Sequence, residues 1–268
     1  MKKRKLRVRF GRKFYERVCL LTPDRADARD FDLTAYFGPA GRGLPVPRKA
    51  DYSREVGPVG DQRETGSCVG WAVAHGLRRW LTGLGAGAPR LSVRFLWMGT
   101  KEVDVWALNV INDLAGTSIR SALKVLNRTG VPLEKYYPFD RDLVRCDPDE
   151  WNEMIADANE HRIGRYYGLD DTRAMEIQLA HSGPFVCGVP VHENFSRFEV
   201  PGIIPEPKGR LCGGHAILVV GHDQDARLFT FLNSWGRKWG KRGFGHLTYD
   251  WMEKYAHSAW AAARLHSQ

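Results

Sequence analysis

The feature that most constrains the fold is a change of hydrophobic pattern near residue 165. Before it, small and apolar residues recur every three or four positions from Cys68 to Leu81, and further helices are predicted at 91–97 and 118–126. After it come short β-favouring runs at 185–191, 216–220, 228–232 and 244–248. The sequence therefore predicts an α+β protein, with a helical lobe over about 60–165, a β-rich lobe over about 166–268, and a cleft between them.

Length and composition favour a compact protein without a membrane span. The chain has 268 residues, 43% of them hydrophobic, which excludes disorder. No stretch approaches the roughly 18 consecutive apolar residues of a membrane-spanning helix, and the basic start precedes only a short apolar patch, Val18 to Leu21. We therefore expect no signal peptide and synthesis in the cytoplasm, and leave export by another route open.

The formal charge of +9 is concentrated at the N-terminus. Residues 1–17 hold nine of the 40 Lys and Arg but only one of the 31 Asp and Glu, so the remainder is almost neutral. Such a tail is most often a solvated extension, and contact with an anionic membrane, nucleic acid or export partner is the alternative. The sequence does not predict the oligomeric state.

Residues 1–44 are interpreted as an extension ahead of a domain at 45–268. Between residues 22 and 50, four prolines alternate with three glycines, a density that neither a helix nor a central strand tolerates. We expect a linker or draped arm, too short for a folded inhibitory prodomain. Surface packing or mobility is favoured over occupation of the cleft.

The five cysteines form no C-x-x-C pair and no dense disulfide framework. At least one is free, which favours a reducing compartment at synthesis, although one or two disulfides after export stay open. They are Cys19, Cys68, Cys146, Cys187 and Cys212.

Cys68 has the setting of a reactive thiol. Gly66 and Ser67 precede it where a loop turns into an apolar helix, so its sulfur is expected at the positive end of the helix dipole. That position lowers the pKa of a thiol. A single cysteine is nevertheless most often a small buried hydrophobic residue.

His215 and Asn233 each lie at the end of a predicted strand. His215 follows Gly213 and Gly214 and precedes the apolar run 216–220, and Asn233 ends the run 229–232. Taken alone, the histidine could be a structural residue at a strand edge and the asparagine a turn residue.

Three segments together resemble the signature blocks of the papain-like cysteine peptidase family, in the family's order. They are Gln62-Arg-Glu-Thr-Gly-Ser-Cys68, Gly213-Gly-His215-Ala, and Asn233-Ser-Trp-Gly followed by Trp239-Gly. Weaker matches begin near residue 45, and the relaxed pattern is similar to that of bacterial members. The resemblance implies a papain-like fold, with a β-barrel-like second lobe, and hydrolysis of peptide bonds in a peptide or protein substrate without a cofactor or metal.

The resemblance also implies roles for individual residues. Cys68 would be the nucleophile, His215 its acid and base, and Asn233 the residue that orients the histidine. Gln62 would complete the oxyanion hole with the backbone N–H of Cys68. The substrate-binding residues would be Gly116, Gly214, Trp235 and Trp239, with Trp235 also shielding the bond between His215 and Asn233.

The sequence departs from the family pattern in two places. Thr65 stands where the family has a disulfide-forming cysteine, and the usual tryptophan after the nucleophile is displaced to Trp71. The family's Cys-x-Gly-Gly pocket segment is missing, and only Gly116 remains as a candidate for backbone pairing with substrate. The helical lobe is therefore expected to lack the usual disulfide, and the first pocket stays poorly defined.

Other functions stay open. A zinc site near Cys212 and His215 lacks a second pair of ligands. A non-catalytic peptide-binding module could share the scaffold, and a transpeptidase or amidase could share the nucleophile, because fold and catalytic residues do not decide the acceptor.

Overall fold

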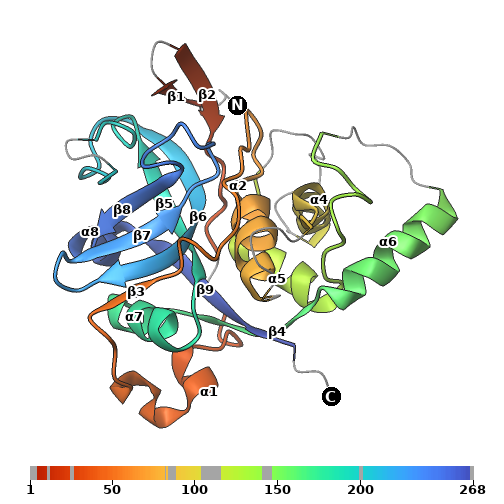
Figure 1. Cartoon of the computed structure of the whole chain (residues 1–268), viewed down its shortest axis with the longest axis horizontal. Coiled ribbons are helices and arrows are strands. Elements are labelled where there is room, and N and C mark those ends of the chain that lie inside the picture. The colour runs from red at the N-terminus through yellow and green to blue at the C-terminus, as the bar shows by residue number, and fades with distance from the viewer. Residues whose placement is uncertain are drawn as a thin grey trace.

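In the computed structural model the chain forms a helical lobe and a sheet-based lobe that lie side by side (Figure 1). The structure describes residues 5–10, 13–24, 27–81, 83, 89–103, 116–140, 147–198 and 202–265. No helix within these ranges is long and apolar enough to cross a membrane. The predicted α+β class is confirmed.

The helical lobe is organised around a continuous helical segment that begins at Cys68. It comprises α2 (Cys68–Gly70), the π-helical stretch η2 (Trp71–Arg78) and α3 (Arg79–Leu81). Against it pack α4 (Val93–Val103) and α5 (Ile119–Arg128), close to the predicted positions. The segment approaches α4 closely at Gly70, where a Cβ would lie 2.9 Å from the carbonyl oxygen of Val93.

Helix α6 (Pro148–Glu160) extends away from the rest of the helical lobe (Figure 1). Asp147 caps its first turn by accepting hydrogen bonds from the N–H groups of Asp149 and Glu150. Met154 and Ala158 of this helix are buried, and Asp157 accepts a hydrogen bond from the N–H of Leu133 at 2.8 Å, so these residues attach the helix to the lobe.

The second lobe is built on a seven-stranded antiparallel sheet. Six strands follow the order β4-β9-β5-β6-β7-β8, and β3 pairs with β6. The predicted strands correspond to β5 to β8, whereas β3, β4 and β9 were not predicted. The strands are β3 (Lys49–Asp51), β4 (Ile163–Gly168), β5 (Phe185–His192), β6 (Leu211–Asp223), β7 (Leu228–Leu232), β8 (Phe244–Thr248) and β9 (His257–Arg264).

Two helices of the second lobe were also not predicted. They are α7 (Thr172–His181), capped by Asp171, and α8 (Tyr249–Tyr255), capped by Thr248. Both contribute buried apolar side chains to the core of this lobe.

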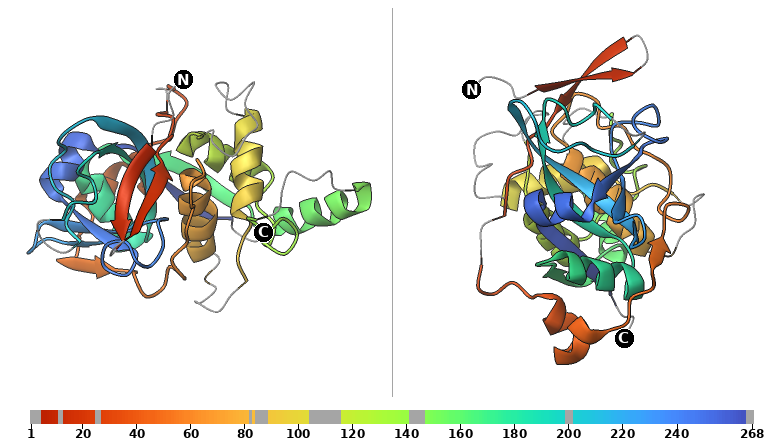
Figure 2. Two further views of the ribbon diagram at one scale, coloured as in Figure 1. Left: turned by 90° about the horizontal axis from the view of Figure 1, so that it is seen from above. Right: turned by 90° about the vertical axis from the view of Figure 1, so that its left-hand side faces the viewer.

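The N-terminal extension is more structured than the sequence predicted. Strands β1 (Lys5–Phe10) and β2 (Lys13–Val18) form an antiparallel hairpin, which lies over the junction of the two lobes (Figure 2). Its residues Leu6 and Val8 are buried in the apolar cluster of the second lobe. Residues 22–50 are mainly irregular, as predicted, but include the short helices α1 (Leu33–Phe37) and η1 (Pro39–Gly43) as well as β3.

Candidate active site

Cys68 lies at the predicted junction of a loop and a helix. It is the first residue of α2, where unpaired N–H groups and the positive end of the helix dipole meet. The side chain is fully buried, and burial raises the pKa of its thiol to about 11, although a hydrogen bond from the backbone of Ala216 opposes this rise. Because Ala216 directly follows His215 on β6, the thiol lies against the strand that carries the predicted base.

His215 and Asn233 are brought together by the pairing of β6 with β7. The Nε2 of His215 lies 2.8 Å from Oδ1 of Asn233, so the ring donates to the amide oxygen through Nε2. The Trp235 ring covers this pair, with its centroid 4.8 Å from that of the imidazole. Among the described residues Nδ1 of His215 has no hydrogen-bond partner although it is buried, which leaves this nitrogen available to a thiol.

Gln62 already contacts a peptide carbonyl. Its Oε1 accepts a hydrogen bond from the hydroxyl of Ser234 at 2.8 Å, which orients the amide. Its Nε2 donates to the carbonyl oxygens of Val18 at 3.1 Å and Thr65 at 2.8 Å. The predicted oxyanion-hole donor therefore binds a backbone carbonyl oxygen of the N-terminal extension.

Residues Arg17–Thr22, which we call the cleft segment, run between the lobes along the predicted site. Leu20 pairs in parallel with Gly214. The N–H of Leu21 donates to the Gly214 carbonyl at 3.0 Å, and the N–H of Thr22 donates to the Thr117 carbonyl at 3.1 Å. This corrects the expectation that the extension packs on the surface or is mobile: three of the four residues of the apolar patch, Val18, Cys19 and Leu21, are buried in the cleft.

Two glycines make room for the cleft segment. A Cβ at Gly116 would lie 1.7 Å from the carbonyl oxygen of Leu20, and a Cβ at Gly213 would lie 1.9 Å from that of Cys19. Gly213 also has a φ of +144°, which side-chain-bearing residues rarely adopt. Gly116 and Gly214, both predicted to bind substrate, contact the cleft segment in this structure.

Trp239, also predicted to bind substrate, belongs with Trp235 to the apolar cluster of the second lobe. It is 1% exposed and packs edge-to-face on Trp235, with ring centroids 5.6 Å apart. Its Nε1 donates to the hydroxyl of Ser196 at 3.0 Å. Trp239 therefore supports Trp235, and its role in substrate binding stays a prediction.

Burial keeps the thiol and the imidazole uncharged. Burial lowers the pKa of His215 to about 4, an effect that its bond to Asn233 opposes and the charge of Arg17 reinforces. With the thiol pKa at about 11, the neutral thiol and neutral imidazole prevail near pH 7. The helix dipole was expected to lower the pKa of the thiol. With the cleft segment in place, the effect of desolvation is larger, so the pKa is raised.

The described cysteines are all free thiols: Cys19, Cys68, Cys187 and Cys212, whereas Cys146 lies outside the described residues. The described part of the chain also contains no group of three or more His, Cys, Asp or Glu side chains that could hold a metal ion. Among these residues, Cys212 and His215 have no further ligands with which to form a zinc site.

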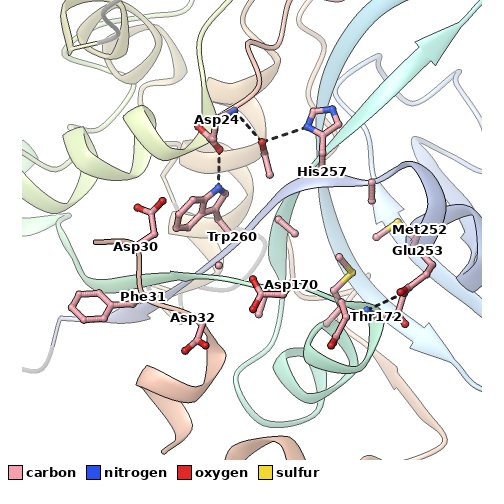
Figure 3. Close-up of a pocket in the computed structure, with 17 residues that line it drawn as sticks. Asp24, Asp30, Phe31, Asp32, Asp170, Thr172, Met252, Glu253, His257 and Trp260 are labelled. Atoms are coloured by element: carbon pink, nitrogen blue, oxygen red, sulfur yellow. Dashed lines mark hydrogen bonds between the residues drawn. The ribbon is translucent and has the colours of Figure 1, made fainter. Parts of the chain in front are cut away.

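Beyond the cleft segment, the chain borders an acidic cavity of about 380 Å³ (Figure 3). Asp24 lines it and accepts hydrogen bonds from Nε1 of Trp260 at 2.8 Å and from the N–H of Arg120 at 3.2 Å. Arg120 in turn pairs with Asp30 at 2.6 Å. These contacts fasten the downstream end of the cleft segment to both lobes.

Sequence reasoning missed four residues that shape this site: Arg17, Leu21, Asp61 and Ser234. The apolar patch was a signal for Leu21, but it is too short to identify its partner. Ser234 could have been found as the neighbour of Asn233 in the third signature block. Arg17 and Asp61 carried no signal, because an isolated charged residue is normally exposed.

The chain is similar to known cysteine proteases in both sequence and fold. The model of the papain family of cysteine proteases matches residues 46–261. A peptidase C1-like protein of Acanthamoeba polyphaga mimivirus, itself uncharacterised, is 27% identical over 262 residues, covering 91% of this chain and 82% of that protein. A cathepsin B-like protein of Giardia intestinalis is 28% identical over 218 residues, covering 74% and 68%. The structure of xylellain, a cysteine protease from Xylella fastidiosa, superimposes with a TM-score of 0.78 at 27% identity, covering 92% and 96%.

Proposed function

Because this chain belongs to the papain family of cysteine proteases, we propose that it hydrolyses peptide bonds with Cys68 as its nucleophile. Its fold is papain-like. The observation that carries the proposal is the contact of Gln62 with a peptide carbonyl, made beside a buried thiol and an imidazole whose Nε2 is bonded to Asn233. This arrangement supports the roles of nucleophile, base, orienting residue and oxyanion-hole donor.

The reaction would proceed in two steps. His215 accepts the proton of the Cys68 thiol through Nδ1, and the sulfur attacks the carbonyl carbon of the scissile bond. The oxyanion accepts hydrogen bonds from Gln62 and the backbone N–H of Cys68, and His215 then protonates the leaving amine. Water, deprotonated by His215, hydrolyses the acyl-enzyme and restores the thiol.

The cleft segment would hold this enzyme in a closed, inactive form. It runs from the oxyanion-hole donor Gln62, at Val18, toward Gly116 and Thr117. In a substrate, the residues before the scissile bond would pair with Gly116, so its chain would run in the opposite direction, from Gly116 toward the oxyanion hole. The cleft segment thus occupies the site with a chain direction opposite to that of a substrate. In this orientation we expect it to block the access of substrate and not to be cleaved itself.

A peptide-library digestion analysed by mass spectrometry tests the proposed function. Cleaved products would support a peptidase, and ligated products would instead indicate a transpeptidase. Release of ammonia from side-chain amides would indicate an amidase. Binding without turnover would favour a non-catalytic peptide-binding module.

The role of Gln62 can be tested separately. Replacing Gln62 by Ala is expected to lower kcat by roughly 100- to 1,000-fold, because one donor to the oxyanion is lost. Steady-state hydrolysis of a fluorogenic peptide measures this. Ser234→Ala, which removes only the hydroxyl that orients the amide, should cause a smaller loss. An unchanged kcat in Gln62→Ala, with an unchanged melting temperature, would contradict the assignment.

Acidification is expected to open the cleft. His215 has a pKa of about 4 in the closed form against an ordinary 6.5, so the closed form binds fewer protons. The contribution of His215 to the stability of the closed form is fully present above about pH 6.5 and is lost as the pH falls toward 4. Burial also lowers the pKa of His257, which acts in the same direction, whereas it raises that of Asp24, which acts in the opposite one.

Hydrogen exchange of the Leu21 and Thr22 amides measures this opening directly, since both N–H groups are bonded across the cleft. After correction for the intrinsic exchange rate, opening at pH 4.5 should exceed that at pH 7.5 by about 10- to 100-fold. His215→Gln should reduce the dependence on pH. Equal protection at both pH values would contradict the expectation.

A further inference from the structure

Arg17, at the start of the cleft segment, is buried beside the candidate active site. The residue is only 3% exposed, and its guanidinium lies 3.1 Å from Oδ1 of Asp61. It also donates to the carbonyl oxygen of Trp235 at 3.4 Å. A charged side chain is rarely buried to this degree unless the protein supplies oppositely charged or polar partners. The cleft thus contains a site that accommodates a cation.

The acceptors of this site are held by the protein framework. Oδ1 of Asp61 accepts a hydrogen bond from the N–H of Arg63 at 2.8 Å, which orients the carboxylate. The backbone of Asp61 pairs with that of Trp235 in an isolated antiparallel bridge. Both acceptors adjoin the predicted machinery, because Asp61 precedes Gln62 and Trp235 covers His215. The site therefore depends on contacts that do not involve Arg17.

The charge of the surroundings matches a cation. Burial lowers the pKa of Arg17, and the largest opposing effects come from the carboxylates of Asp61 and Glu64. The Asp61 side chain keeps 46% of its surface exposed, so a ligand arriving from solvent can reach it once Arg17 has left. A guanidinium or ammonium group would then find an oriented carboxylate and a carbonyl oxygen.

The site lies on the leaving-group side of the proposed scissile bond. The carbonyl of Val18 contacts Gln62, and the residues after it run toward Gly116, where the acyl side of a substrate would pair. Arg17 precedes Val18 and lies on the other side of this carbonyl. In a substrate, that region receives the residues after the scissile bond.

We propose that Asp61, together with the carbonyl oxygen of Trp235, forms a subsite for a Lys or Arg side chain in the first or second residue after the scissile bond. Arg17 is the chain's own occupant of this subsite in the closed form. The proposal rests on the proposed peptidase function and adds a substrate class to it, namely peptides with a basic residue on the leaving-group side.

Internally quenched peptides that vary only in the two residues after the scissile bond test the subsite. The full chain carrying Leu21→Ala, a substitution that weakens the seating of the cleft segment, is compared with the same chain that also carries Asp61→Asn. The asparagine keeps an oxygen for the N–H of Arg63 but loses the charge. A matched control is Asp250→Asn, at a carboxylate that is 79% exposed and paired with Arg227.

With Asp61 present, a Lys or Arg at one of the two positions should raise kcat/KM by about five-fold over Ala, and Glu should lower it. Asp61→Asn should abolish this preference, measured within each variant as the ratio of kcat/KM for the basic peptide to that for the Ala peptide, and Asp250→Asn should retain it. Hydrolysis without a basic preference, or a preference that survives Asp61→Asn, would overturn the subsite alone. Failure of every peptide to be hydrolysed would overturn the proposed function and the subsite with it.

Discussion

Replacement of Cys68 by Ala is expected to abolish peptide hydrolysis, with kcat falling by roughly 10⁵- to 10⁶-fold. No other described thiol lies at the start of a helix with Ala216 and the buried Nδ1 of His215 beside it. Replacing His215 by Ala should cost a similar factor, because the thiol then loses its base. The double variant should be no worse than either single one, since the two residues act as one unit.

The matched control is Cys187→Ala. Cys187 is also a free and fully buried thiol, and burial raises its pKa to about 12, yet it lies within β5 and its thiol donates to backbone carbonyls. Hydrolysis should survive this substitution. A thiol-directed epoxide probe followed by peptide mapping provides a second measurement, with labelling expected at Cys68 and reduced in His215→Ala. Retention of hydrolysis in Cys68→Ala would disprove the nucleophile assignment.

The parts of the site that were predictable depend on local sequence. Small and apolar residues at helical spacing predict the helix that begins at Cys68. The strands before Asn233 and after His215 are continuous β-favouring runs. The three signature blocks occur in the order of the papain-like family, and this resemblance predicted that their residues meet in one cleft. Elements defined by their own residues were therefore found, with β7 and β8 at their predicted bounds and β6 longer than predicted.

The unpredicted parts depend on distant partners. Strand β9 contains Ala261 and Ala262, which favour helices, and it is a strand because it pairs with β4 and β5. In β1, the alternation of Leu6 and Val8 is obscured by the basic residues around them. The cleft segment is extended because Gly116 and Gly214 lie nearly 100 and 200 residues further along the chain and leave room for its backbone. No local pattern specifies such pairings.

The same long-range burial changes the electrostatics of the site. A helix start lowers the pKa of a thiol, and this alone predicts an activated Cys68. In the closed form, desolvation by the surrounding protein is the larger effect and raises that pKa to about 11. Reactivity should therefore be a property of the open form, in which water and substrate replace the cleft segment.

Replacing Leu21 by Ala is expected to raise kcat/KM of the full chain by about 10- to 30-fold. Leu21 is 5% exposed and belongs to the apolar cluster that includes Val186, Ala216 and Trp260. Truncating such a leucine typically costs 2–5 kcal/mol, and about 2 kcal/mol lost from the closed form alone multiplies the open fraction by about 30. The gain would cease once the open form predominates.

Hydrolysis of a fluorogenic peptide and hydrogen exchange of the Leu21 and Thr22 amide positions should change together in this variant. The matched control is Leu265→Ala, because Leu265 is 52% exposed and should alter neither measurement. The body of the protein should melt at nearly the same temperature, since the cleft segment is held mainly by contacts across the cleft. Unchanged hydrolysis despite faster exchange would show that the segment does not limit substrate access. A fall in hydrolysis with intact folding would instead make Leu21 part of the catalytic structure.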